Sequence, residues 1–447
     1  DNTTRLWNVD RGTHSKKLFG TGYRGTAAVS WQKNRNTALI VTGSDDRMTP
    51  AWLWRVPTDG SPVKTALLTD YAKRQLAEQL KIESSRTDAG GQIELADVGL
   101  DRTNRMMRRI ADVTTIAFSA NGEQFVIGNS QGRCFIFLID PDTLEVQLST
   151  SFQAHGSAVN CALFSPSNDS LFTADSEGQL MQWDTTTGQV VHRFDWSGPV
   201  TSIDLSDDGS RLIAGLAPEE SVETPVAVLY HIDSKGPTVE TTFPVRSPSG
   251  NRDWSINQPT VRSVQVLPGQ ERALISLFFP TSDASQNPNG LSGYQLGYWN
   301  WNGTLADFTR IESSKAGEIA SASLGEDRDG EQLLIVGGKG ARLMRANDPE
   351  QTRFQVVTKS FRPATNVRSA DFAFDPSSGQ SNRLVVGDSE GNIRVWQLDG
   401  DQWTEDAQAA VHLAGMHADP IIATDFDPTD ANRLLTADEA GTWKVWR

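Results

Sequence analysis

The sequence is poor in cysteine and in positive charge. Its 447 residues include two cysteines, Cys134 and Cys161, which are too few for a disulfide framework or a thiolate metal cluster. Because buried cysteine usually behaves as a small apolar side chain, we expect both to be core residues of predicted strands. The formal net charge of −15 argues against a nucleic-acid backbone or an anionic membrane as the main partner.

Long apolar segments and catalytic motifs are also missing from the sequence. No stretch is long and apolar enough to cross a membrane as a helix. The six histidines show no zinc-type spacing, and no Gly-x-Ser-x-Gly sequence marks a hydrolase nucleophile. The glycine-rich segment 337–340 lacks the spacing of a phosphate-binding loop and lies between two predicted strands, which favours a turn. We therefore expect no catalytic residue, no metal site and no cofactor.

One phrase recurs along the chain. It runs from Asp175 to Asp184 (DSEGQLMQWD), it returns at residues 388–396 and 438–446, and weaker copies occupy residues 129–137 and 1–7. In the complete copies a turn containing glycine leads into a short strand that ends on an aromatic residue, and the phrase closes a unit of four short strands. Such a meander, repeated at a period of about forty to fifty residues, predicts sheets that bury their faces against one another.

These features resemble the WD-repeat β-propeller family. The resemblance rests on Trp183-Asp184, on the glycine of the preceding turn, and on Ala154-His155 where the family has Gly-His. It covers nearly the whole chain, with degenerate repeats that we interpret as bacterial-type. The resemblance implies structural roles for residues at repeat positions, namely Trp7, His155, Trp183, Trp396, His417 and Trp446.

The family also has a hydrogen-bond set of Asp, His, Ser or Thr, and Trp. Its turn Asp, six residues before the Trp, is matched by Asp1 but replaced by Glu177, Glu390 and Ala440 in other copies. The resemblance therefore implies that this set is incomplete in most blades.

The fold class that we predict is all-β, a β-propeller of four-stranded antiparallel blades with one short helical insertion. Residues 69–110 interrupt the repeats, with Asp70 as a candidate cap for a helix over residues 70–82, followed by a basic run at residues 102–109 that we interpret as a solvated linker. Seven units follow, so we expect seven blades over residues 111–447.

In this interpretation residues 1–68 complete a preceding propeller. The alternative is a single eight-bladed ring in which residues 1–68 supply the first blade. Because the chain opens in the middle of a repeat, we expect it to be a piece of a longer protein with several propellers.

The long insertions indicate an interaction surface. Turns between first and second strands are mostly compact, whereas residues 217–225, 246–259 and 279–293 form long connections on the opposite rim. Loops on a rigid scaffold are frequent binding surfaces, and Trp and Arg are enriched among interface anchors. The predicted partner-binding residues are Arg252, Trp254 and Arg262.

The sequence therefore favours a non-catalytic interaction scaffold that binds a protein or peptide carrying an apolar residue flanked by acidic ones. The first alternative is a catalytic or cofactor-binding propeller, since carboxylates that are far apart in sequence can meet in a fold. The second is a structural spacer between domains. We expect no nucleic-acid or membrane partner and a monomeric propeller within a larger chain. The sequence leaves the cellular location open and favours a cytoplasmic one.

Overall fold

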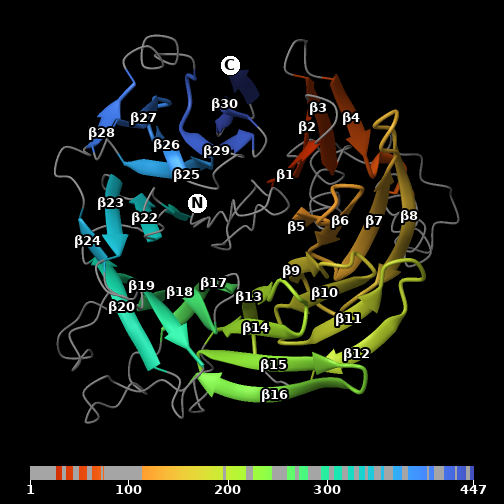
Figure 1. Cartoon of the computed structure of the whole chain (residues 1–447). Coiled ribbons are helices and arrows are strands. Elements are labelled where there is room, and N and C mark those ends of the chain that lie inside the picture. Colours follow the sequence, from red (N-terminus) through yellow and green to blue (C-terminus); the bar gives the residue numbers. More distant parts are fainter. Residues whose placement is uncertain are drawn as a thin grey trace, which may run out of the picture. The chain divides into compact units, whose positions relative to one another are not determined.

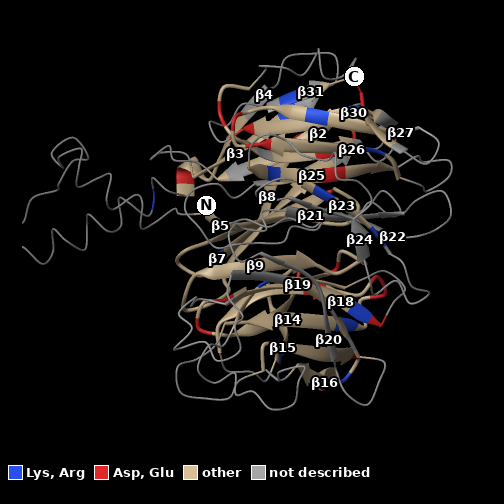
Figure 2. Ribbon diagram, turned by 90° about the vertical axis from the view of Figure 1, so that its left-hand side faces the viewer, with Lys and Arg blue, Asp and Glu red and all other residues tan. Residues whose placement is uncertain are grey.

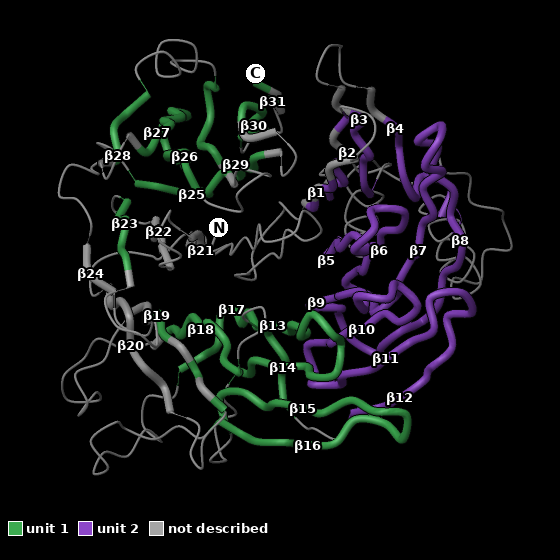
Figure 3. Tube along the Cα trace, in the orientation of Figure 1, with its two compact units in different colours: residues 1–22, 198–447 green, residues 23–197 purple. Residues whose placement is uncertain are grey.

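The computed structural model describes residues 27–32, 37–43, 50–57, 63–71, 74, 113–194, 198–217, 225–243, 259–266, 271–279, 293–301, 307–314, 321–326, 332–337, 341–346, 354–356, 366–374, 381–399, 402–406, 417–427, 430–438 and 443–446. These residues are mainly β-strand (Figure 1). Residues 23–197 form one compact unit, and residues 198–447 together with residues 1–22 form a second (Figure 3).

The unit of residues 23–197 contains three antiparallel sheets, which we number in chain order. The first sheet consists of β1 (Ala27–Gln32), β2 (Thr37–Gly43), β3 (Ala51–Pro57) and β4 (Val63–Leu67); the second of β5 (Val113–Phe118), β6 (Gln124–Asn129), β7 (Arg133–Ile139) and β8 (Val146–Gln153); and the third of β9 (Val159–Phe164), β10 (Ser170–Asp175), β11 (Leu180–Asp184) and β12 (Val190–Phe194).

The second unit contains five further antiparallel sheets. The fourth sheet consists of β13 (Val200–Leu205), β14 (Arg211–Leu216), β15 (Ala227–Asp233) and β16 (Gly236–Phe243); the fifth of β17 (Thr260–Val266), β18 (Arg272–Phe279), β19 (Gly293–Asn300) and β20 (Asp307–Ser314); the sixth of β21 (Ser321–Glu326), β22 (Gln332–Gly337), β23 (Ala341–Ala346) and β24 (Phe354–Val356); the seventh of β25 (Val367–Phe374), β26 (Ser381–Asp388), β27 (Ile393–Asp399) and β28 (Gln402–Glu405); and the eighth of β29 (Ile421–Asp427), β30 (Asp430–Asp438) and β31 (Trp443–Trp446).

The predicted count of seven blades is wrong. The described residues form eight sheets, seven with four strands and one with three. The first sheet, which the prediction assigned to another propeller, shares a hydrophobic core with the second sheet, in which Leu39 and Leu53 pack with Phe125 and Phe135. The interruption at residues 69–110 therefore connects two sheets that pack together. Residues 1–26, which include Trp7, lie outside the described residues.

Little of the predicted helix lies within the described residues. Residues 69–71 and 74 are helical, which starts the turn one residue before the predicted cap at Asp70. The Tyr71 ring packs edge-on against Phe135, with ring centroids 4.7 Å apart, so this turn is fixed on the second sheet. The rest of the helix and the basic run at residues 102–109 lie outside the described residues.

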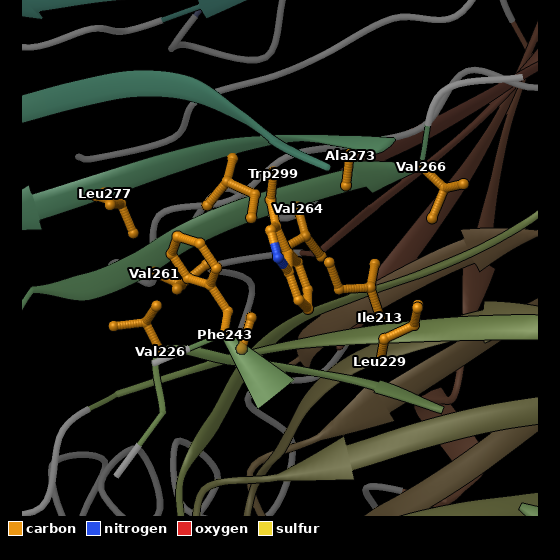
Figure 4. Packing of buried hydrophobic residues seen from close by; sticks show 12 residues of the cluster. Ile213, Val226, Leu229, Phe243, Val261, Val264, Val266, Ala273, Leu277 and Trp299 are labelled. Carbon is orange, nitrogen blue, oxygen red and sulfur yellow. The ribbon is translucent and has the colours of Figure 1, made fainter. Parts of the chain in front are cut away.

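Each sheet is a meander in which strands adjacent in sequence pair with each other. The alternation of side chains along a strand gives every sheet two faces, and both are apolar in the middle strands. In the fifth sheet, Val264 and Trp299 point toward Ile213 and Phe243 of the fourth sheet (Figure 4), and Ile275 belongs to the same cluster. Burial of both faces explains why the strands are almost continuously apolar rather than alternating with polar residues.

Charged residues are concentrated away from these cores. Most of the strand ribbon is uncharged, and acidic residues gather at turns and strand ends (Figure 2). The turn before β14 illustrates the arrangement, since it contains Asp207 and Asp208. The sheets therefore place most of their ionisable groups on the surface, and some of the buried exceptions form the polar sets described next.

Candidate interaction surface

The third sheet contains a buried polar set of four side chains, three of which are joined by hydrogen bonds. His155 lies in the loop that enters β9, and its Nε2 is 2.7 Å from Thr173 Oγ1 on β10. The same hydroxyl accepts a hydrogen bond from Trp183 Nε1 on β11 at 2.8 Å. On the other side of the imidazole, Nδ1 lies 3.5 Å from Asp175 Oδ2. The set connects the entry loop to the second and third strands of the sheet.

The eighth sheet repeats this arrangement. His417 Nε2 is 2.8 Å from Thr436 Oγ1, which also accepts a hydrogen bond from Trp446 Nε1 at 2.9 Å. The His417 Nδ1 atom is 2.8 Å from Asp438 Oδ2. The same four residue types therefore meet in both sheets, and both sets use a histidine in the loop before the first strand. Among the described residues, the hydrogen bond between histidine and aspartate is present in the eighth sheet and not in the third.

The acidic member of each set was missed by sequence reasoning. We expected it six residues before the Trp, where Glu177 is exposed. The structure uses Asp175, eight residues before Trp183, which is fully buried. Its Oδ1 accepts hydrogen bonds from the backbone N–H groups of Glu177 at 3.1 Å and Gln179 at 2.7 Å. The signal was available, because the three best copies of the phrase begin with Asp.

Strand register explains why the set is absent from the fifth sheet. Trp183 pairs with Leu171, and the required hydroxyl is two residues farther along the second strand, at Thr173. In the fifth sheet Trp299 pairs with Ala273, so the corresponding residue is Ile275. Among the described residues, the buried Trp299 Nε1 has no hydrogen-bond partner. Apolar packing replaces the polar set in that sheet.

The histidine in the third sheet is held in its neutral form. Burial lowers the pKa of His155, and this effect exceeds the opposing influence of the Asp175 carboxylate, which raises the pKa. The imidazole side chain is fully buried, with Nε2 at hydrogen-bond distance from Thr173 and Nδ1 beside the Asp175 carboxylate. It is therefore a structural link that fixes the entry loop and is not placed to exchange protons with a substrate.

Glycine in the recurring phrase allows the entry loops to approach these turns. Gly132 and Gly391 have φ angles of 78° and 81°, in the region that favours glycine. A Cβ atom at Gly391 would lie 2.6 Å from the backbone oxygen of His417, and one at Gly132 would clash with that of His155. In both places the turn between the second and third strands packs directly against the next histidine loop.

The compact turns between first and second strands are stabilised by hydrogen bonds from side chains of these turns. Asn168 Oδ1 in the β9–β10 turn accepts a hydrogen bond from Ala120 N in the β5–β6 turn at 2.8 Å. In the β13–β14 turn, Ser206 Oγ donates to Asp208 Oδ1 at 2.6 Å. Hydrogen bonds from Ser206 and from Ser210 lower the pKa of Asp208 to about 2. The Asp208 carboxylate is thus engaged within its own turn, and the Asn168 amide joins two neighbouring turns.

Of the three predicted partner-binding residues, Arg252 and Trp254 lie outside the described residues. Arg262 is on β17, and its guanidinium carbon lies 4.9 Å from the centre of the Phe278 ring on β18. It is therefore located where β17 follows the segment 246–259 and β18 leads into the segment 279–293. Most of segments 217–225, 246–259 and 279–293 is outside the described residues.

The repeat tryptophans pack on the sheet that precedes their own. Trp183 contacts the cluster that contains Ile136 of the second sheet, and Trp396 joins the cluster that contains Leu343 of the sixth sheet. Trp446 packs against the cluster that contains Val385 of the seventh sheet.

Within the described ranges, no group of three or more His, Cys, Asp or Glu side chains could hold a metal ion. Among the same residues, no helix has the length and apolar character needed to cross a membrane. Cys134 and Cys161 are both buried with free thiols, and burial raises the pKa of each to about 12, so neither is a reactive thiolate.

Comparison with known proteins identifies a repeat family. Residues 146–184 match the family model described as WD domain, G-beta repeat. The guanine nucleotide-binding protein subunit beta-1 of Nicotiana tabacum is 34% identical over 113 residues, which are 23% of this chain and 29% of that protein. The Protein LST8 homolog of Dictyostelium discoideum is 25% identical over 190 residues, 41% of this chain and 60% of that protein.

The matches thus span less than two thirds of these relatives' own length. Among solved structures, the computationally designed Ika8 protein is similar over 96% of this chain and 98% of its own, with a TM-score of 0.53 at 15% identity. This likeness concerns the fold alone.

Proposed function

The chain is a WD-repeat propeller protein, and we propose that it serves as a non-catalytic scaffold that binds a protein or peptide. The observation that carries this proposal is the structural use of its buried polar groups. In the third and eighth sheets, the buried histidine joins its entry loop to a threonine of the second strand through a hydrogen bond. The polar chemistry of these sheets is thus used to hold loops in place, as an interaction platform requires.

The proposed binding face is the rim that carries segments 217–225, 246–259 and 279–293. Two observations support this choice. The compact turns of the opposite rim bond to themselves, as in the Asp208 turn, which leaves fewer groups to recognise a partner. Arg262 contacts Phe278 immediately before the third of these segments, so a positive charge stands at the base of two long connections.

The partner of this proposal is a protein or peptide with an apolar residue flanked by acidic ones. Trp254 is the apolar anchor, and Arg252 with Arg262 supplies local positive charge on a chain of net charge −15. Trp and Arg dominate binding energy where a partner excludes water from them. The proposal includes no nucleic-acid or membrane partner, a monomeric propeller within a larger chain, and a cytoplasmic location.

The test is affinity capture followed by a binding measurement with the captured partner. We expect Trp254→Ala and Arg252→Ala each to weaken binding at least about fivefold, which corresponds to about 1 kcal/mol, without lowering the thermal melting temperature. The matched control is Arg211→Ala, which removes the same charge beside a compact turn, where Arg211 Nε lies 2.9 Å from Glu240 Oε2. Unchanged affinity in both loop variants and in a 279–293 deletion would rule out this face.

A further inference from the structure

The outer edge of the second sheet is formed by β8, the last strand in the order of that sheet (Figure 1). In the described part of the chain, β8 pairs with β7 alone. A strand at the edge of a sheet presents a row of main-chain N–H and C=O groups to which another strand can pair. Five of the eight residues of β8 are exposed, so this edge is accessible.

The sequence of β8 lacks the features that protect the other outer strands from pairing. It reads VQLSTSFQ and contains no charged residue and no proline. Proteins usually block an exposed edge with charges, with proline or by keeping the strand very short. In the other described sheets of four strands, β4, β12, β20 and β28 contain charged residues, β16 contains Pro237 and Glu240, and β24 has three residues. The edge of β8 is therefore the unprotected one among these sheets.

A bulge in β8 does not replace this protection. Leu148 pairs with Phe137 and Thr150 pairs with Ile136, so Ser149 is the extra residue. The third and fourth sheets have the same irregularity between their third and outer strands, and their outer strands contain charged residues as well. Because β8 pairs with β7 on both sides of Ser149, it offers an edge to an added strand on both sides of the bulge.

Two apolar side chains are exposed near the start of β8. Leu148 is 41% exposed, and Leu138 on β7 is 45% exposed. Leu138 pairs with Gln147, the residue before Leu148, so both leucines lie at the same end of the strand pair. Side chains that stand opposite each other on neighbouring strands contact one another. An added strand would therefore cover Leu148 with a side chain of its own.

The turn that leads into β8 is acidic. Asp140, Asp142 and Glu145 are all exposed. The basic group that the described contacts place at this turn is Arg55, whose Nε donates a hydrogen bond to Leu144 O at 2.7 Å, so three carboxylates stand against one guanidinium. A strand that is added antiparallel to β8 ends beside this turn. Complementary charge there requires Lys or Arg directly after the added strand.

We propose that residues 146–153 form a docking edge, to which an extended segment of a partner protein adds as a further antiparallel strand of the second sheet. The segment has an apolar residue opposite Leu148 and Lys or Arg directly after its strand. Main-chain hydrogen bonds supply the affinity, and the side chains beside them supply the specificity. The unprotected edge carries the proposal, and the acidic turn determines only the charge of the partner. The docking edge and the binding face proposed above lie in different sheets, so either proposal can fail without the other.

The test uses a synthetic peptide of alternating threonine and valine that ends in lysines, added to the whole chain. Hydrogen–deuterium exchange is read by mass spectrometry on fragments that cover residues 146–153. We expect the peptide to slow exchange of these amides about five- to tenfold, because N–H groups of the edge become hydrogen-bonded. A second peptide of the same composition carries its lysines at the N-terminal end. It should bind about threefold more weakly, because its charges lie away from the acidic turn.

Leu148→Ala removes the apolar contact, and we expect it to weaken binding of the first peptide about fivefold in a fluorescence-anisotropy titration. The matched control is Val190→Ala, which truncates a side chain that is 38% exposed on β12, a strand protected by Arg193. This control should leave the affinity unchanged.

The proposal is overturned if the first peptide leaves exchange of residues 146–153 unchanged, if the two peptides bind equally, or if Val190→Ala weakens binding as much as Leu148→Ala does. It is also overturned if exchange of residues 146–153 slows as the protein concentration rises without peptide. That result would assign the edge to a second copy of this chain.

Discussion

Replacing Thr173 by valine should destabilise the third sheet without creating a cavity. The hydroxyl of Thr173 is bonded to His155 Nε2 at 2.7 Å and to Trp183 Nε1 at 2.8 Å, and all three residues are less than 5% exposed. Valine keeps the branched shape, so the loss comes from the hydroxyl alone. The substitution leaves an indole N–H and an imidazole nitrogen buried and unpaired.

Each unpaired buried polar group costs about 1–3 kcal/mol. The two costs share one acceptor and one pocket, so they are not fully additive. We therefore expect the free energy of unfolding to fall by about 2–4 kcal/mol. Thr436→Val in the eighth sheet should give a loss of similar size, because Thr436 makes the same pair of hydrogen bonds.

Urea unfolding followed by tryptophan fluorescence is the assay, with Thr186→Val as the control. Thr186 lies in the exposed turn after β11, so the same chemical change there should alter stability by less than about 0.5 kcal/mol. The reasoning fails if Thr173→Val and Thr186→Val unfold at the same urea concentration with the same slope. That result would mean that the buried hydrogen bonds contribute nothing beyond packing.

Two further predictions follow from the same geometry. Ile275→Thr offers a hydroxyl to the unpaired indole of the fifth sheet, so it should lower the free energy of unfolding by at least about 1 kcal/mol less than Ile127→Thr does. Ile127 is the control because it is equally buried and has the same position in a sheet with Phe in place of Trp. Equal urea midpoints of the two variants would contradict this prediction. Because burial lowers the pKa of His155, the unfolded chain takes up the proton first, so stability should decline as the pH falls below about 6.5. The difference in the free energy of unfolding between the wild-type protein and His155→Gln should then shrink between pH 7.5 and pH 5. A constant difference would refute the conclusion that burial lowers the pKa of His155.

The fold class was predictable because the recurring phrase specifies a strand, a turn and an aromatic residue at fixed spacing. The sheet count was not, because residues 69–110 break the rhythm and resemble a domain boundary, although the first sheet packs directly on the second. A sequence carries no mark that separates a long connection within an array from a linker between arrays. Only the shared core of Leu39 with Phe125 makes that distinction.

The buried polar sets were partly predictable from the sequence. Thr173 and Thr436 stand ten residues before Trp183 and Trp446, and Val386 takes this position before Trp396, so both sets could have been foreseen. The rule fails for Trp299, because the long segment 279–293 separates it from its second strand. The partner-binding residues Arg252 and Trp254 belong to such connections, where strand periodicity gives no information about side-chain position.

The offset between repeat and sheet has a consequence for how such a chain can evolve. The repeat at residues 146–184 starts on the outer strand of the second sheet and ends with the third strand of the third sheet, and it carries His155 between them. A gene duplication of this segment would therefore supply at once both surfaces of the new contact between neighbouring sheets. Arrays of this kind can lengthen or shorten by one repeat without requiring a new type of interface between sheets. The connecting loops are then free to diverge in sequence.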